Sequence, residues 1–154
     1  MHLKIIEKDI LDVEHGIIAH QVHIQHPDGR TPGVFGAGLA KQVKDKYPNA
    51  YTDYRCRLWR LGDVQLVPIN HRLIIANCAG QLTYGKDKRH TNYGALALCL
   101  CKLFDVEVEY RMPLYIPYGM GCGLAGGDWD IVSELIWEIV PQATICRLTK
   151  TLAT

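Results

Sequence analysis

The sequence predicts a single α/β domain in which helices cover a mostly parallel sheet. Apolar runs of strand length alternate along the chain with segments of helical periodicity, which is the order found in layered α/β proteins. The length of 154 residues is that of one ordinary domain. No repeat, low-complexity tract or linker divides the sequence, so we expect one domain over residues 1–154.

The first third of the sequence predicts two strands, a long loop and a helix. "HLKII" (2–6) and "HGIIAH" (15–20) have the apolar character of short strands. Residues 21–38 are rich in proline and glycine and predict a loop, whose length is typical of functional or mobile segments. Residues 37–48 then predict an amphipathic helix that starts at Ala37 and ends before Pro48. Its inner face would carry Leu39, Ala40, Val43 and Tyr47.

The middle of the sequence predicts a hairpin followed by a helix. Strands at 63–69 and 72–80 would be joined by a tight turn at Asn70-His71, and the second is apolar on both faces, as in a covered sheet. After the polar loop 81–90, Thr91 or Asn92 can cap a well-buried helix that runs through Phe104.

The last third predicts a strand, a helix and a final strand, at 112–118, 129–140 and 143–148. Asp128 is the best available cap for that helix. Ligands of such sheets bind beyond the carboxyl ends of the strands, and both glycine-rich segments of the sequence lie there.

Composition limits the classes of partner. With 17 basic and 16 acidic residues the net charge is +1, so we expect no long-range attraction to nucleic acid or to an anionic membrane. The six cysteines lie mostly in apolar runs without zinc-site spacing, which favours free, buried thiols in a reducing compartment. No apolar run of ~18 residues and no leader-like segment is present, so we expect a soluble, cytoplasmic protein.

The segment "GMGCGLAGGDW" (119–129) contains the pattern G-x-G-x-x-G but does not predict a Rossmann dinucleotide site. That site needs an acidic residue ~20 positions further on, where this sequence has Cys146 and Arg147. The acidic pair Asp128 and Asp130 would also repel a phosphate placed on the helix that follows. A phosphate would instead be wrapped by the backbone N–H groups of residues 119–126.

A second glycine-rich segment, "GVFGAG" (33–38), opens the first helix without an acidic residue. Its free N–H groups and the helix dipole are open to an anion. Two such loops at one edge of the sheet predict two phosphates, or one diphosphate gripped from both sides. The alternative is that the glycines serve only to permit tight turns.

These blocks, in this order, resemble the macro domain family of ADP-ribose-binding modules and enzymes. The resemblance covers nearly the whole chain and rests on "EKDILDV", "IIAHQVH", "GVFGAGLAKQVKDKYP", "LGDVQLVPI", "IIANCAGQLTYG" and "IPYGMGCGLAGGDW". It implies a three-layer α/β/α fold with a central mixed, mostly parallel sheet. Within the family the sequence is most similar to the branch of the ADP-ribose 1''-phosphate phosphatases, their bacteriophage homologues and the terminal ADP-ribose hydrolases.

The resemblance implies a set of ligand contacts. Asp9 would accept a hydrogen bond from the adenine amino group and the Ile10 N–H would meet a ring nitrogen, although Asp9 could instead cap the turn before Leu11. Arg147 and Leu148 would lie against the adenine, where the family often has an aromatic residue that is missing here. The remaining implied contacts are Gly36, Ala37, Gly38 and Leu39 on one side of the diphosphate, Gly119, Met120, Gly121, Cys122, Gly123, Leu124 and Ala125 on the other, and Asn77.

Histidines provide the candidate chemistry. His20 matches a histidine of the phosphatase-like branch and could act as general acid, general base or phosphoryl nucleophile. Its alternative is a core histidine bonded to the backbone. His23 stands where many family members have an asparagine that holds the distal ribose, and His26 resembles an ordinary loop residue. A metal site on the three histidines would need a helix, which Pro27 and the preceding strand argue against, so we expect no metal.

A second catalytic candidate is Asp128, which could activate water or simply cap its helix. The deglutamylating hydrolases of this branch use a lysine and an aspartate where this sequence has Asn77 and Ala125, so we do not expect that route. The expected function is hydrolysis of ADP-ribose 1''-phosphate to ADP-ribose and phosphate. The alternatives are hydrolysis of ADP-ribosyl esters and a non-catalytic reader of ADP-ribose. No cofactor is expected, and ADP-ribosylated proteins are candidate partners.

Overall fold

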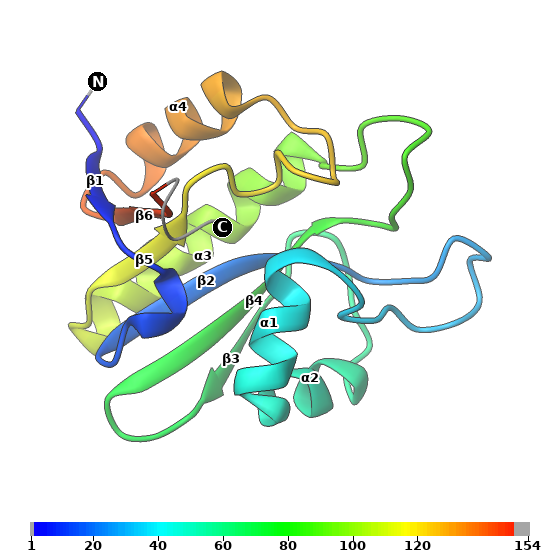
Figure 1. Cartoon of the computed structure of the whole chain (residues 1–154), viewed down its shortest axis with the longest axis horizontal. Coiled ribbons are helices and arrows are strands. Elements are labelled where there is room, and N and C mark those ends of the chain that lie inside the picture. The colour runs from blue at the N-terminus through cyan, green and yellow to red at the C-terminus, as the bar shows by residue number, and fades with distance from the viewer. Residues whose placement is uncertain (1, 150–154) are drawn as a thin grey trace.

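The computed structural model describes residues 2–149, in which one mixed sheet forms the centre of the molecule (Figure 1). Its strands lie in the order β1-β6-β5-β2-β4-β3, and all neighbours are parallel except the antiparallel β3-β4 pair. The strands are β1 Lys4–Glu7, β2 Gly16–His23, β3 Val64–Pro68, β4 Leu73–Gln81, β5 Leu114–Pro117 and β6 Thr144–Arg147. The helices are α1 Gly38–Lys46, α2 Pro48–Arg55, α3 Tyr93–Tyr110 and α4 Trp129–Ile139, and η1 Ile10–Asp12 is a single 3-10 turn.

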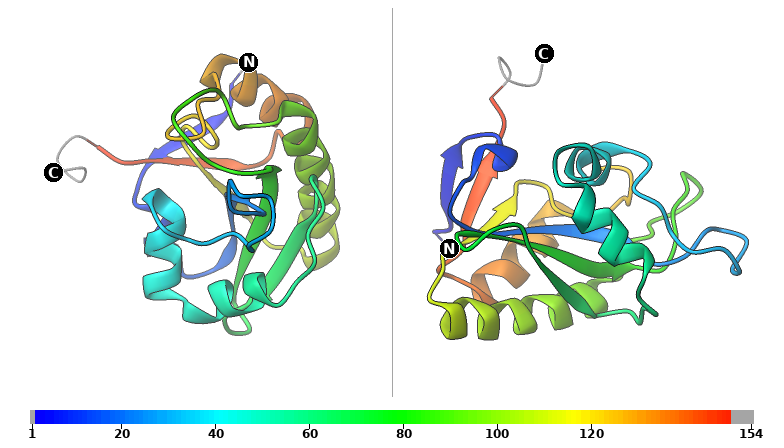
Figure 2. Two further views of the ribbon diagram at one scale, coloured as in Figure 1. Left: turned by 90° about the vertical axis from the view of Figure 1, so that its right-hand side faces the viewer. Right: turned by 90° about the horizontal axis from the view of Figure 1, so that it is seen from below.

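Helices cover both faces of the sheet, as a three-layer α/β/α fold requires (Figure 2). Successive residues of a strand point to opposite faces. Accordingly, Ile17 and Ala19 of β2 pack with α3 and α4, whereas Ile18 and Val22 pack with α1 and α2. The predicted fold class, with a mixed and mostly parallel sheet, is confirmed.

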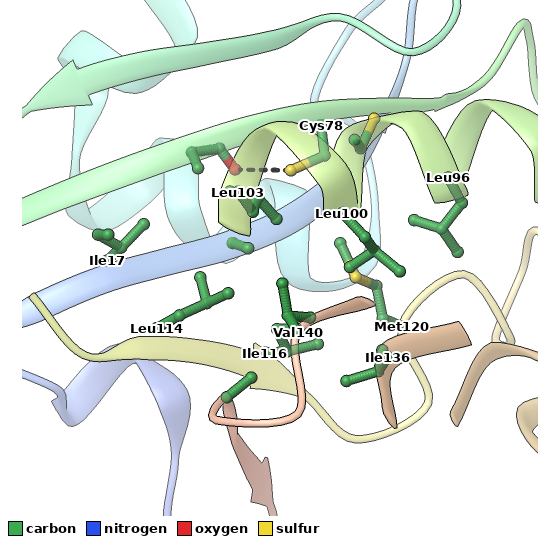
Figure 3. Packing of buried hydrophobic residues seen from close by; sticks show 14 of the residues in the cluster. Ile17, Cys78, Leu96, Leu100, Leu103, Leu114, Ile116, Met120, Ile136 and Val140 are labelled. Carbon is green, nitrogen blue, oxygen red and sulfur yellow. Dashed lines mark hydrogen bonds between the residues drawn. The ribbon is translucent and has the colours of Figure 1, made fainter. Parts of the chain in front are cut away.

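The larger of the two cores lies between the sheet and α3 (Figure 3). Leu96, Leu100 and Leu103 of α3 are fully buried there. Truncation of such a leucine to alanine typically costs 2–5 kcal/mol of stability. The apolar sequence of α3 predicted a well-buried helix. The structure differs in part, because Leu98 is 55% exposed.

Two predicted boundaries differ from the structure by three residues or more. β2 continues to His23, so the first three residues predicted as loop are strand that pairs with β4 through a register shift at Val22/His23. This extension matters because it places Gln21 in the sheet. α3 begins after Asn92, whose side chain accepts the Ala95 N–H at 2.9 Å, and it ends at Tyr110 rather than at Phe104.

The sequence analysis did not predict α2. Pro48 does end the α1 segment, since α1 stops at Lys46, but the same proline occupies the first turn of α2. Proline is well suited to that position, because its fixed φ is helical and the missing N–H would have no partner there. The helix buries Ala50 and Tyr54 against the sheet.

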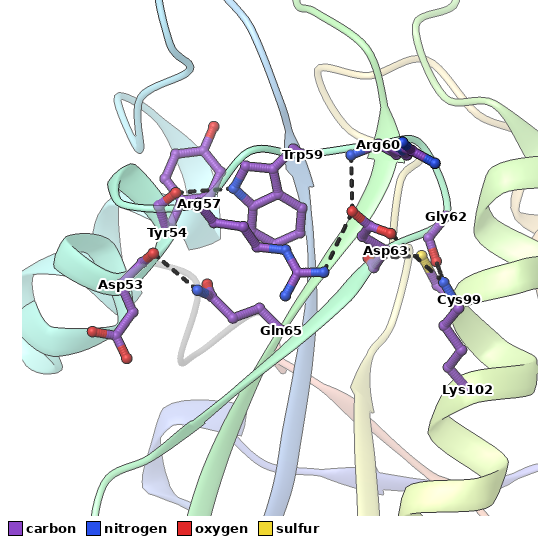
Figure 4. A network of polar contacts seen from close by, with 10 residues as sticks. All are labelled: Asp53, Tyr54, Arg57, Trp59, Arg60, Gly62, Asp63, Gln65, Cys99 and Lys102. Carbon is purple, nitrogen blue, oxygen red and sulfur yellow. Dashed lines mark hydrogen bonds and ion pairs between the residues drawn. The ribbon is translucent and has the colours of Figure 1, made fainter.

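The connection from α2 to β3 is held by Asp63 (Figure 4). This carboxylate accepts the Arg60 N–H at 2.8 Å and forms ion pairs with Arg57 at 3.4 Å and with Lys102 of α3 at 3.8 Å. Such partly exposed pairs contribute little singly, and their effect is to position the connection.

Several loops gather at the carboxyl ends of β2, β4 and β5, as predicted for a ligand site in an α/β sheet (Figure 1). All six cysteines are free, and three of them, Cys78, Cys99 and Cys146, are buried, so the expectation of mostly buried thiols holds for half of them. Among residues 2–149, no helix combines the length and the apolar character needed to cross a bilayer.

Candidate functional site

A cleft of about 570 Å³ lies among these loops, at the start of α1. Most of the predicted diphosphate residues line it. The predicted residues that line the cleft are His20, His23, Gly36, Ala37, Gly38, Leu39, Gly119, Met120, Gly121, Gly123, Leu124 and Ala125. Asp9, Ile10, Asn77, Cys122, Asp128, Arg147 and Leu148 lie outside its lining. The structure therefore brings together the two glycine-rich loops and the histidines, but not the residues predicted to contact adenine.

The start of α1 forms one side of the cleft and leaves its amide groups open. Ala37 is the N-cap and offers no side-chain hydrogen bond, and the first turn contains no acidic residue. The first amides of a helix have no partner within the helix, and the helix dipole is positive at this end. Gly38 adopts φ +59°, which favours glycine at the point where the loop enters the helix. This end of α1 is suited to an anion.

The loop 119–126 forms the other side. Its turns are closed by the Cys122 N–H to the Gly119 carbonyl at 2.8 Å and by the Gly127 N–H to the Gly121 carbonyl at 2.9 Å. Other backbone N–H groups of the loop have no acceptor within residues 2–149; these belong to Gly119, Gly121, Gly123, Leu124 and Ala125. A run of free amides around positive-φ glycines is the arrangement of an anion-binding nest.

A network of side chains that the sequence analysis missed fixes this loop to the sheet. The Gln21 amide donates to Gln81 Oε1 and to Thr91 Oγ1, both at 2.9 Å. The Thr91 hydroxyl in turn donates to the Gly121 carbonyl at 2.5 Å. A Cβ atom at Gly121, where φ is +74°, would lie 2.8 Å from Gln21 Oε1. The only signal in the sequence was the position of Gln21 next to His20, in a segment predicted as loop.

His20 is held in a defined tautomer. Asn77 Nδ2 donates to the Ala50 carbonyl at 3.1 Å and to Gln65 Oε1 at 3.0 Å, so its Oδ1 faces His20 Nε2 at 2.6 Å as an acceptor. His20 must then carry its proton on Nε2, and Nδ1 keeps a lone pair. The hydrogen-bond partner of His20 is therefore a side chain, whereas the core-histidine alternative predicted a backbone partner.

Burial keeps His20 neutral. The side chain is 1% exposed, and its burial lowers the pKa to about 4, although the Asn77 hydrogen bond acts in the opposite direction. Nδ1 is buried and has no hydrogen-bond partner within the described residues. Asn77 therefore orients His20 in this structure, and its contact with the ligand stays a prediction.

His23 is also neutral. Its Nε2 accepts the Val34 N–H at 3.0 Å, which places the ring proton on Nδ1. Burial, with a smaller effect of His26, lowers the pKa of His23 to about 4. The ring packs on Tyr84, with 4.6 Å between centroids. Within residues 2–149, no three His, Cys, Asp or Glu side chains are grouped as metal ligands.

The predicted adenine residues have other partners. Asp9 Oδ1 accepts the Leu11 N–H at 3.0 Å and caps η1, as in the capping alternative. Arg147 Nε donates to Glu7 at 2.8 Å, and the guanidinium lies 5.4 Å from the centre of the Tyr118 ring. Tyr118, which the sequence analysis missed, lines the cleft and is 42% exposed. It provides an aromatic surface at the end of the cleft nearest to Arg147.

Asp128 caps α4, as predicted. Its Oδ1 accepts the Asp130 N–H at 2.9 Å, and its own N–H donates to the Tyr93 hydroxyl. The side chain is exposed and lies outside the cleft lining. The geometry favours the capping role, and a catalytic role for Asp128 stays a prediction.

Comparison with known proteins identifies the fold. No protein-family model and no curated protein matches the sequence. Among solved structures, a Bacteroides thetaiotaomicron protein of unknown function is 25% identical, with a TM-score of 0.79, over 96% of this chain and 99% of the other. A macrodomain protein from Streptomyces coelicolor is 22% identical, with a TM-score of 0.74, over 96% and 99% of the two chains. Thermosipho africanus DarTG in complex with ADP-ribose is 18% identical, with a TM-score of 0.72, over 96% of this chain and 41% of that protein. The chain has the macrodomain fold.

Proposed function

We propose that this protein binds ADP-ribose, or a derivative of it, in the cleft between α1 and the loop 119–126. The observation that carries the proposal is the presence of free backbone donors on two sides of one cleft. Donors so arranged suit a diphosphate, and a volume of about 570 Å³ is in the range of ligand sites. Thermosipho africanus DarTG, part of which has a similar fold, is seen in complex with ADP-ribose.

In this proposal the diphosphate lies between the two loops. The adenine points toward Asp9, Ile10 and Tyr118, and the distal ribose points toward His20 and His23. Arg147 then acts on the adenine end through Tyr118, whose ring it supports. Leu148 is 46% exposed and remains available to the base.

The finer proposal is hydrolysis of ADP-ribose 1''-phosphate, as expected for the phosphatase branch. A water attacks the phosphorus atom, the bond from phosphorus to the ribose oxygen breaks, and the products are ADP-ribose and inorganic phosphate. Once the cleft wall moves to admit water, His20 Nδ1 accepts the proton of the attacking water, since Asn77 leaves its lone pair at that atom. The imidazolium then returns this proton to the leaving ribose oxygen, which becomes the 1''-hydroxyl of ADP-ribose. A group with a pKa of about 4 is a weak base, so positioning and backbone donors supply most of the acceleration.

One observation favours the non-catalytic reader as the second candidate. His20 is almost fully buried and its Nδ1 lies beneath the surface, so a water cannot reach that atom without movement of the cleft wall. A reader needs only the two loops, and its ligands would include ADP-ribosylated proteins.

Calorimetry with ADP-ribose, followed by phosphate release from ADP-ribose 1''-phosphate, tests both proposals. We expect binding and release in the natural protein, and binding with little release in His20→Ala. His15→Ala, which changes an exposed histidine outside the cleft, is the matched control and should behave as the natural protein. Absence of binding overturns the proposed site. Binding without release leaves the reader, and full release by His20→Ala rejects the mechanism.

A further inference from the structure

Charge is distributed unevenly along the cleft. Among its lining residues in the described chain, Lys86 has the only side chain of the Asp, Glu, Lys or Arg type. His20 and His23 add no charge at neutral pH, because burial holds the pKa of each at about 4. In the proposed function the diphosphate, by contrast, would meet backbone N–H groups.

The loop that carries Lys86 is attached at both ends. At its start, the Leu82 carbonyl accepts the N–H groups of Ile24 and Gln25, at 3.1 and 3.0 Å. At its end, the Ala125 carbonyl accepts the N–H groups of His90 and Thr91, at 2.8 and 3.1 Å. The loop therefore spans from the end of β2 to the loop 119–126, which we call the diphosphate loop, and Lys86 lies in the middle of that span.

The neighbouring carboxylate does not neutralise Lys86. Asp87 is hydrogen bonded to His90 Nε2 at 2.8 Å, and this bond is the main reason that the pKa of Asp87 is lowered. Within residues 2–149, Lys86 forms no ion pair or hydrogen bond. Lys86 thus brings an unpaired ammonium to the cleft two residues after Tyr84, whose ring contacts His23.

We propose that Lys86 makes the cleft selective for ADP-ribose derivatives that carry an additional anionic group, of the phosphate-monoester class, on the distal ribose. The inference rests on the proposed function and adds to it the residue that selects the phosphorylated ligand, because a neutral ester at the same position would gain nothing from the ammonium. The side chain is exposed, so its effect is a modest, salt-dependent preference and not the main source of affinity.

The test measures displacement of fluorescent ADP-ribose by two probes. One is ADP-ribose, and the other is a phosphonate analogue of ADP-ribose 1''-phosphate, which carries the same charges and cannot be hydrolysed. We expect the natural protein to bind the phosphonate about fivefold more tightly at low salt, and this preference to shrink as salt is added. Lys86→Gln should abolish the preference, because it should weaken binding of the phosphonate more than binding of ADP-ribose, whereas Lys86→Arg should keep it.

Lys88→Gln is the matched control, since Lys88 is an exposed lysine of the same loop that does not line the cleft. It should keep the preference. The inference is overturned by equal affinity of the natural protein for both probes, by a preference that survives in Lys86→Gln, or by its equal loss in Lys88→Gln. Failure of the natural protein to bind ADP-ribose is a different outcome, which overturns the proposed function itself.

Discussion

The two glycine-rich loops line the same cleft but are followed by helices that begin in opposite ways. α1 starts at Ala37 with no side-chain cap and no acidic residue in its first turn. α4 starts at Asp128, whose carboxylate caps the helix, and Asp130 adds a second negative charge. One helix end is therefore open to an anion and the other is closed by the protein's own carboxylates.

If both loops bind the diphosphate as we propose, they use two distinct sets of donors. At α1 the helix end itself supplies the donors and the dipole. Before α4 the loop supplies them, with its shape fixed by Gln21 and Thr91 and by the positive φ of Gly121. We test this comparison first at Gly121 in the loop 119–126, then through the protonation of His20 and His23, and then at the N-termini of α1 and α4.

The largest effect is expected for Gly121→Ala. The new Cβ would lie 2.8 Å from Gln21 Oε1 and 3.0 Å from Thr91 Oγ1, at a φ that alanine avoids. We expect a loss of stability of about 1–3 kcal/mol and a loss of ADP-ribose affinity of about tenfold or more. Denaturation and calorimetry measure the two effects.

Gly123→Ala is the control for that experiment, because no atom lies within 4 Å of a Cβ placed there and its φ is not positive. It should unfold at the same denaturant concentration as the natural protein. Equal behaviour of the two variants would contradict the role of the Gln21 network.

The next effect concerns pH. Burial lowers the pKa of His20 in the folded protein from 6.5 to about 4. As the pH falls, the unfolded chain therefore binds a proton at this histidine at a higher pH than the folded protein does. This contribution to stability is complete above pH 6.5 and is lost as the pH falls toward 4, and it amounts to about 3 kcal/mol. His23 acts in the same direction.

Urea denaturation between pH 7 and pH 4.5 measures this loss. His23→Asn should make the dependence shallower, while His15→Gln, at an exposed position, should not. ADP-ribose affinity should stay constant from pH 8 to pH 5.5, since both cleft histidines remain neutral there. A fall in affinity over that range would show that a charged histidine holds the ligand.

Ala37→Asp would make the start of α1 resemble that of α4. The new carboxylate can cap the helix, which stabilises it by about 1 kcal/mol, but its charge repels the diphosphate. We therefore expect higher stability together with about tenfold weaker ADP-ribose binding. Ala37→Ser, which caps without a charge, is the control and should retain the affinity. If both variants bind as the natural protein does, the ligand does not use this helix end.

Asp128→Ala should have the smallest effect. Loss of the cap lowers stability by about 1 kcal/mol, and ADP-ribose affinity should change little because the side chain lies outside the cleft lining. Phosphate release by this variant also tests the predicted catalytic role. If phosphate release falls while ADP-ribose binding is kept, Asp128 has a catalytic role. The control is Asp128→Asn, which can still cap the helix and therefore separates the loss of the charge from the loss of the cap.

Local patterns were the reliable part of the sequence-based prediction. The alternation of strands and helices predicted the layered fold. The cap at Asp128 was identified, and Asn92 was one of two candidate caps for α3, because a cap bonds to an amide only two or three residues away. α2 was missed because Pro48 was interpreted only as the end of a helix, although proline is equally suited to begin one.

The candidate site was predicted as two separate glycine-rich segments and several side chains. Its connections could not be predicted, because they join residues far apart in the chain. Gln21 meets Thr91 across 70 positions, and His20 meets Asn77 across 57. The His20–Asn77 contact depends on the register between β2 and β4, and the Gln21–Thr91 contact depends also on the bridge between Gln81 and Thr91; no local pattern reveals either.

The sequence by itself determined where the backbone can adopt a positive φ, which helix end carries acidic residues and which side chains are available for chemistry. These are properties of single residues and near neighbours. Only the tertiary structure decided that His20 is neutral with its lone pair on Nδ1, that Gln21 shapes the diphosphate loop, and that Lys86 is the charged side chain of the cleft. Burial and the pairing of distant strands set these properties, because they fix which groups lose water and which acceptors each donor can reach.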